Sequence, residues 1–163
     1  MNIEFTIRQL LPKDESKLRE IVALSFSRLM GFFAVHSLLS EDGEVLIADV
    51  QGTPIGFVKL IRFEIGGGWY GCVLWIGVHP EFRRKGVASA LTKEGTQRLK
   101  QEGAKAVFAS TQRRNIAAQN LLIQIGFRRV GFVDLWRVFG GRVFEFYGDI
   151  WLAPGETVLI KEY

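Results

Sequence analysis

The feature that most constrains the fold is a pair of long apolar runs, residues 55–65 and 69–78, that stand on either side of three glycines. Such runs, rich in Val, Ile, Phe and Trp, favour β-strands, and glycine allows the tight turn that joins two of them. Pro80 ends the second run. The middle of the chain is therefore predicted to form a long antiparallel hairpin.

Helices are predicted on both sides of this hairpin. Asp14 is placed to cap a helix whose apolar positions recur at helical spacing, namely Leu18, Ile21, Val22, Phe26 and Leu29. Two later helices, residues 86–101 and 115–125, stop at Gly103 and Gly126, because glycine commonly follows the last turn of a helix.

The remaining segments make the pattern mixed. They are strands at residues 3–10, 44–50 and 105–110, a short helix at 31–40, and a second hairpin formed by 127–139 and 142–152 around Gly140 and Gly141. A helix lies between the strand that ends at 78 and the strand that begins at 105, which favours a parallel pair. The element order indicates one mixed α/β domain over residues 1–163.

Composition limits the setting in which the chain acts. A single cysteine, Cys72, excludes an intrachain disulfide and favours a reducing compartment. The N-terminus does not resemble a signal peptide, and no run approaches the roughly 18 apolar residues of a membrane helix. We therefore expect a cytoplasmic protein without a membrane partner. The net charge of +4 fits an anionic ligand, but no long basic run or familiar motif favours nucleic acid.

The stretch "HPEFRRKGVASAL", residues 79–91, points to an anionic ligand. Three consecutive cations precede Gly86 at the start of a helix, where the positive end of the helix dipole disfavours further positive charge. The backbone N–H groups at a helix start bind anions well, and a glycine lets a phosphate approach the backbone closely. The stretch predicts a phosphate or pyrophosphate cradle, although neither G-x-x-x-x-G-K-[ST] nor G-x-G-x-x-G occurs in the chain.

These residues resemble the GNAT superfamily of N-acetyltransferases. The pyrophosphate loop of that family reads [RQ]-x-x-G-x-[GA], which matches residues 83–88, and its preceding V-x-P-x-x matches residues 78–82. A second family motif, N-x-x-A-x-x-L-[YF]-x-x-x-G-F, is matched downstream apart from its [YF] position. The residues at its defined positions are Asn115, Ala118, Leu121, Leu122, Gly126 and Phe127.

The resemblance implies a mixed, mostly antiparallel twisted sheet of about seven strands with a splayed parallel pair, flanked by about four helices. It also implies acetyl-CoA as acyl donor and direct acetyl transfer to a primary amine of a protein N-terminus, a lysine or a small molecule. The donor contacts it implies are Ile76, Gly77, Val78, Arg83, Arg84, Lys85, Gly86, Val87, Ala88, Ser89, Asn115 and Ala118. No metal is implied, and two histidines with one cysteine, far apart, do not suggest a zinc site.

The usual catalytic residues of the family are missing. Leu122 stands where many members have a Tyr that acts as general acid. Ser110 stands where one branch of the family has a Glu that acts as general base. Glu64 is a candidate base, with a solvated strand end as the alternative. Tyr147 on the predicted last hairpin is a candidate acid or base, with half-buried packing as the alternative.

Two other functions remain open: a non-catalytic CoA-binding module, and a nucleic-acid-binding domain that uses the basic loop. The apolar last strands could supply the surface of a homodimer. Of the other reactive residues, His36 is predicted to be a core histidine, His79 a turn residue and Cys72 a buried apolar residue.

Overall fold

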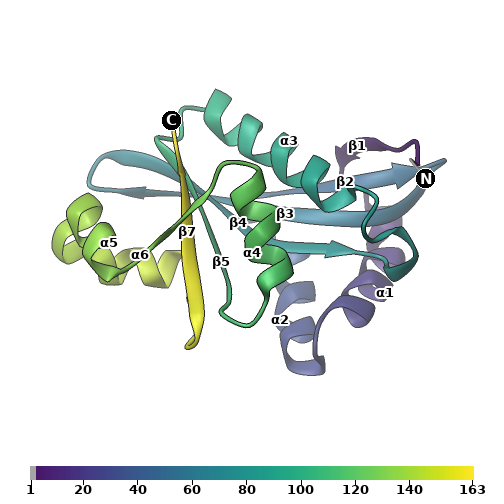
Figure 1. Cartoon of the computed structure of the whole chain (residues 1–163). Coiled ribbons are helices and arrows are strands. Elements are labelled where there is room, and N and C mark those ends of the chain that lie inside the picture. The colour runs from purple at the N-terminus through teal and green to yellow at the C-terminus, as the bar shows by residue number, and fades with distance from the viewer. Residues whose placement is uncertain (1–2) are drawn as a thin grey trace. The chain divides into compact units, whose positions relative to one another are not determined.

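The computed structural model describes residues 3–163, and in that part of the chain seven strands form one sheet (Figure 1). The strands are β1 (Thr6–Gln9), β2 (Glu44–Val50), β3 (Thr53–Ile65), β4 (Gly68–Val78), β5 (Ala106–Gln112), β6 (Arg128–Val130) and β7 (Glu156–Glu162). Their order across the sheet is β1-β2-β3-β4-β5-β7-β6. The pair β4–β5 is parallel, with Cys72 opposite Phe108, which confirms the predicted parallel pair.

Helices connect the strands in the order that the sequence predicts up to residue 127. The α-helices of the described residues are α1 (Glu15–Ser25), α2 (Arg28–Leu38), α3 (Val87–Gln101), α4 (Ile116–Gln124), α5 (Phe132–Phe139) and α6 (Val143–Asp149). Gly103 and Gly126 follow α3 and α4 with φ of 94° and 101°, so both predicted stops are confirmed. No helix in the described part of the chain is both long and apolar enough to cross a membrane.

The predicted central hairpin is β3 and β4. Gly66 and Gly67 form the turn between the two strands, with φ of 61° and 75°. Positive φ at both central residues is the requirement of the two-residue turn that matches the twist of a β-hairpin, and glycine adopts it without strain.

The chain divides into two compact units, and the first comprises Met1–Ile61 and Trp75–Gly95. Helices α1 and α2 cover one face of β2 and β3 in this unit. The buried residues of this layer are Leu18, Ile21, Val22, Ala34, Leu38, Val45, Ile47 and Phe57. On α3, a Cβ at Gly95 would lie 2.8 Å from the Leu60 side chain, so the helix comes close to β3 because this residue is glycine.

The second unit comprises Arg62–Leu74 and Thr96–Tyr163. Its core is a cluster of aromatic rings from β3, β4, β5 and the helices α5 and α6. The cluster contains Phe63, Tyr70, Phe108, Phe139 and Phe146, with neighbouring ring centroids 4.6–6.3 Å apart. Aromatic pairs at these distances contribute beyond the area they bury.

The predicted second hairpin is wrong. Residues 132–149 fold mainly as α5 and α6, which lie side by side in Figure 1, and only 128–130 and 156–162 are strands. Aromatic and β-branched residues suggested strands, but Leu135 and Phe139 are buried at i,i+4 spacing, which is the spacing of one helix face. Asp134 accepts a hydrogen bond from Gly131 N–H and so helps to start α5.

Asp14 precedes α1 as predicted but does not cap the helix with its side chain. Its carboxylate instead accepts hydrogen bonds from Leu11 N–H (2.8 Å) and from the Arg8 guanidinium (2.6 Å). Arg8 also pairs with Asp49 at 2.6 Å. One arginine thus neutralises two buried carboxylates and ties β1 to β2 and to the start of α1.

Candidate functional site

The loop between β4 and α3 contains two residues with a left-handed backbone. Arg84 and Gly86 both have left-handed φ, 59° and 80°. Alternation of left-handed and other residues in a tight loop gathers N–H groups on one side, as in backbone anion nests. The hydrogen bond that starts α3 runs from Ala90 N–H to Gly86 O, so the N–H groups of residues 87–89 have no acceptor within the helix.

Gly86 leaves open space where a ligand would lie. A Cβ built at this position meets no atom within 4 Å, and the positive φ makes any side chain there strained. A positive φ is uncommon for a residue other than glycine and costs free energy, and Arg84, two residues before Gly86, has one. Both features fit a loop shaped to receive a phosphate.

The three cations of the loop differ in whether their side chains already make hydrogen bonds. Arg83 donates to Val78 O (2.9 Å), Leu24 O (3.1 Å) and the hydroxyl of Ser25 (3.3 Å), so its guanidinium holds the end of α1 against the end of β4. Lys85 donates to Glu81 O at 2.9 Å. Arg84 makes no side-chain hydrogen bond or ion pair with the described residues and is exposed, so it alone of the three can turn fully to a ligand.

A buried indole N–H near the end of β4 has no hydrogen-bond acceptor among the described residues. Trp75 precedes the predicted donor-binding residues 76–78, and its indole Nε1 is buried without a hydrogen-bond partner among the described residues. Phe26 packs edge-on against this indole at 5.4 Å. A Cβ at Gly77 would lie 2.5 Å from the Phe57 ring, so only glycine fits there.

In the second unit, the start of α4 is ordered by two polar side chains. Asn115 caps the helix by accepting a hydrogen bond from Ala118 N–H at 3.1 Å. Gln119 is buried and donates to Gln112 O and Arg113 O, which fixes the loop after β5. Sequence reasoning missed Gln119, since no local pattern distinguishes it from a solvated helix residue.

The residues at the usual catalytic positions are unsuited to proton transfer. Leu122 is buried on α4, and Ser110 is half-buried on β5. Cys72 is fully buried as predicted, and burial raises the pKa of its thiol.

The two candidate catalytic residues also belong to the second unit. Glu64 is exposed on β3 and lies on the opposite face from Phe63, whose ring packs on Phe146 of α6. Tyr147 is half-buried on α6, on the side of the sheet that Phe63 faces. The two residues are therefore not placed as an acid–base pair. Asp149 on α6 is a further candidate, because burial and the charge of Glu145 raise the pKa of its carboxyl.

Of the predictions for the two histidines, one is confirmed and one is wrong. His79 is a turn residue as predicted, with its ring 3.3 Å from a Glu20 carboxylate oxygen. The prediction of a core histidine at His36 is wrong, since it is exposed on α2. The described residues contain no group of three or more His, Cys, Asp or Glu that could hold a metal ion.

A mixed seven-stranded sheet with one parallel pair is the architecture that the resemblance to the GNAT family implies. A sequence model of the acetyltransferase (GNAT) family matches residues 8–127, which is more than half of the chain. The chain therefore belongs to the GNAT acetyltransferase family.

Solved structures share this fold along nearly the whole chain. The NatC complex bound to Gag peptide and CoA contains a chain with a TM-score of 0.75 and 17% identity, covering 99% of both chains. PaiA N-acetyltransferase from Thermoplasma acidophilum, solved with coenzyme A, has a TM-score of 0.71 and 17% identity over 99% of this chain and 100% of that one. The ribosomal-protein-S18-alanine N-acetyltransferase from Escherichia coli has a TM-score of 0.68 and 18% identity over 98% and 94%.

Proposed function

We propose that this family member is an N-acetyltransferase that transfers the acetyl group of acetyl-CoA to a primary amine. The observation that carries the proposal is the loop before α3, where left-handed Arg84 and Gly86 precede the N–H groups of residues 87–89. Such a loop suits a pyrophosphate. Family membership supports acetyl-CoA as the donor, and two of the similar structures contain CoA.

The proposed donor contacts follow from the loop and the family motifs. The backbone of residues 76–78 would bind the pantetheine arm, and the N–H groups of residues 84–89 would bind the pyrophosphate. Asn115 and Ala118 would contribute from the start of α4. We assign the side chain of Arg84 to phosphate binding and that of Arg83 to positioning the loop, because only Arg83 is already hydrogen-bonded to α1.

The reaction needs two proton movements. The nitrogen of a neutral amine forms a bond to the thioester carbon, the carbon–sulfur bond breaks, and the thiolate leaves with the electron pair. The amine loses a proton and the thiolate gains one, so a base and an acid, or water, must act. Tyr147 is the proposed acid and Asp149, on the same helix, the proposed base, while Glu64 is a candidate base that would act without Tyr147. The acceptor is an amine of a protein N-terminus, a lysine or a small molecule, and the chain acts as one domain in the cytoplasm.

Two assays on the full chain test this function. A ligand present at about 100 times its dissociation constant stabilises the folded state by about 2.7 kcal/mol, so acetyl-CoA and CoA should raise the melting temperature. AMP, which has neither the pantetheine arm nor the pyrophosphate, should not. A panel of peptide, lysine and polyamine acceptors should then release CoA thiol from acetyl-CoA. Absence of both effects would contradict the proposal.

A non-catalytic CoA-binding module is the second candidate, favoured by Leu122 and Ser110 at the usual catalytic positions. It predicts the same rise in melting temperature without thiol release from any acceptor. Where thiol release is observed, Tyr147→Phe should lower turnover and leave the affinity for acetyl-CoA unchanged.

A further inference from the structure

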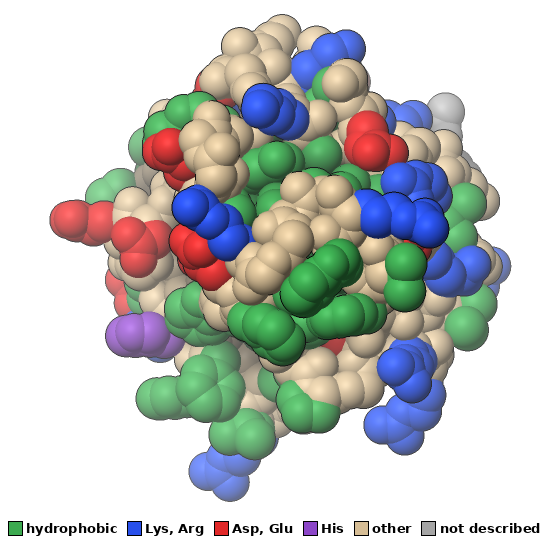
Figure 2. Space-filling view, turned by 90° about the vertical axis from the view of Figure 1, so that its left-hand side faces the viewer, with side chains coloured by type: hydrophobic (Ala, Val, Ile, Leu, Met, Phe, Trp, Pro, Cys, Tyr) green, Lys and Arg blue, Asp and Glu red, His purple; other side chains and the backbone are tan. Residues whose placement is uncertain are grey.

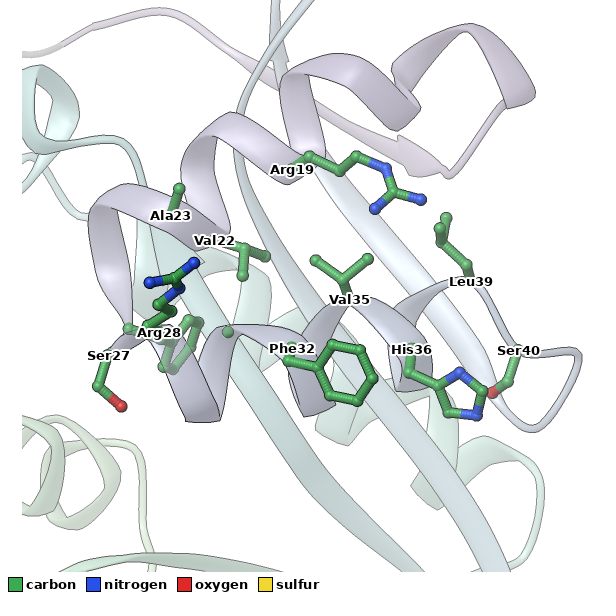
Figure 3. Close-up of a pocket in the computed structure, with 12 residues that line it drawn as sticks. Arg19, Val22, Ala23, Ser27, Arg28, Phe32, Val35, His36, Leu39 and Ser40 are labelled. Carbon is green, nitrogen blue, oxygen red and sulfur yellow. The ribbon is translucent and has the colours of Figure 1, made fainter.

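A groove of about 810 Å³ runs between α1 and α2 in the first unit (Figure 3). This volume is typical of sites that bind small molecules. Val22 from α1 and Val35 from α2 point toward one another in its middle, and the ring of Phe32 borders it. Phe32 is 70% exposed, so an aromatic side chain stands at this groove without cover from the described residues.

The charged side chains that line the groove are both arginines. Arg28 lies toward one end and Arg19 toward the other, and His36 lies along α2 (Figure 3). Arg19 pairs with Glu15 at 2.7 Å, whereas Arg28 and His36 make no side-chain hydrogen bond or ion pair with the part of the chain that the structure describes. No Asp or Glu is among the described residues that line the groove.

We propose that this groove binds a small amphipathic anion, a carboxylate joined to an alkyl or aromatic body. The carboxylate pairs with Arg28, which carries a charge and has no side-chain partner among residues 3–163, and charge-assisted hydrogen bonds of this kind are the strong ones. The apolar body covers Phe32, Val35 and Leu39 and removes their exposed surface from water. A cation of the same shape is repelled. The proposal does not depend on acetyl transfer.

The test is calorimetric titration of the full chain, without acetyl-CoA, with decanoate, decanol and decyltrimethylammonium below their micelle concentrations. Decanoate should bind at one site, decanol at least about tenfold more weakly, and the cation not measurably. Arg28→Gln should weaken decanoate binding about tenfold and leave decanol unchanged. Equal affinity for decanoate and decanol, or an unchanged Arg28→Gln variant, would overturn the proposal.

A variant that fills the groove gives an independent readout. Gly31 lines the groove, and a Cβ there would contact Val22 at an ordinary 3.5 Å, so Gly31→Leu places a side chain in the space without a clash at its base. It should abolish decanoate binding. Gly148→Leu is the matched control, because it changes another helical glycine whose Cβ meets nothing within 4 Å. Decanoate binding by Gly31→Leu at the wild-type affinity would refute the site, and Arg28→Gln decides if Gly31→Leu does not fold.

Discussion

At the scale of single residues, we propose separate tasks for Arg83 and Arg84 of the basic loop. Arg84→Gln should weaken CoA binding about tenfold, since it removes one charge-assisted contact, and should leave the melting temperature unchanged. Arg83→Gln should instead lower the melting temperature, since three hydrogen bonds to β4 and α1 are lost. Calorimetry and thermal melts on both variants measure the difference. Wild-type CoA affinity in Arg84→Gln would contradict the assignment.

Asp14 makes stability depend on pH. The hydrogen bond from Arg8 lowers the pKa of this carboxyl below its ordinary value, so its stabilising effect is present above the ordinary pKa and is lost as the pH falls through the lowered one. Asp14→Asn should therefore reduce the free energy of unfolding by about 2 kcal/mol at pH 7, and the difference from wild type should shrink in acid. Denaturant titrations at several pH values test this, with the exposed Glu15→Gln as control. A difference that does not vary with pH would argue against it.

At the scale of elements, the packing of α3 on β3 depends on one glycine. Glycine-to-alanine changes in helices usually stabilise a protein by up to about 1 kcal/mol, and Gly148→Ala on α6 should do so. Gly95→Ala should destabilise the fold by about 1–2 kcal/mol, because its Cβ would lie 2.8 Å from the fully buried Leu60. Denaturant unfolding of both variants tests the packing, and a stabilised Gly95→Ala would disprove it.

The elements α5 and α6 show why the last predicted hairpin is wrong. The aromatic residues of this segment favour strands locally. Phe139 on α5 and Phe146 on α6 nevertheless lie on helices, and both rings pack against Phe108 of β5. That tertiary packing overrides local preference. It leaves other aromatic residues outside, including Phe132, Trp136 and Phe144, and hydrophobic side chains gather on this side of the molecule (Figure 2). An apolar surface here would therefore belong to helices and not to the predicted strands, and the homodimer stays a prediction.

At the scale of the whole molecule, what the sequence predicts well is local. The hairpin turn at Gly66 and Gly67 and the start of α3 after Gly86 follow from backbone requirements that a few adjacent residues meet. What it misses depends on residues far apart in the chain. The hydrogen bond of Arg83 to Leu24 joins residues 59 positions apart, and no spacing rule reveals it. The groove between α1 and α2 likewise exists only after the two helices pack.

We propose that the loop before α3 binds the pyrophosphate of acetyl-CoA. The most direct test is a calorimetric titration of acetyl-CoA into the wild type, Gly86→Glu and Gly52→Glu. Gly52 is a matched control, because it also has a positive φ, 86°, and open space around its Cβ, but it lies in the β2–β3 turn. We predict that Gly86→Glu abolishes binding and Gly52→Glu leaves it intact. Equal binding by all three proteins would contradict the placement of the donor site.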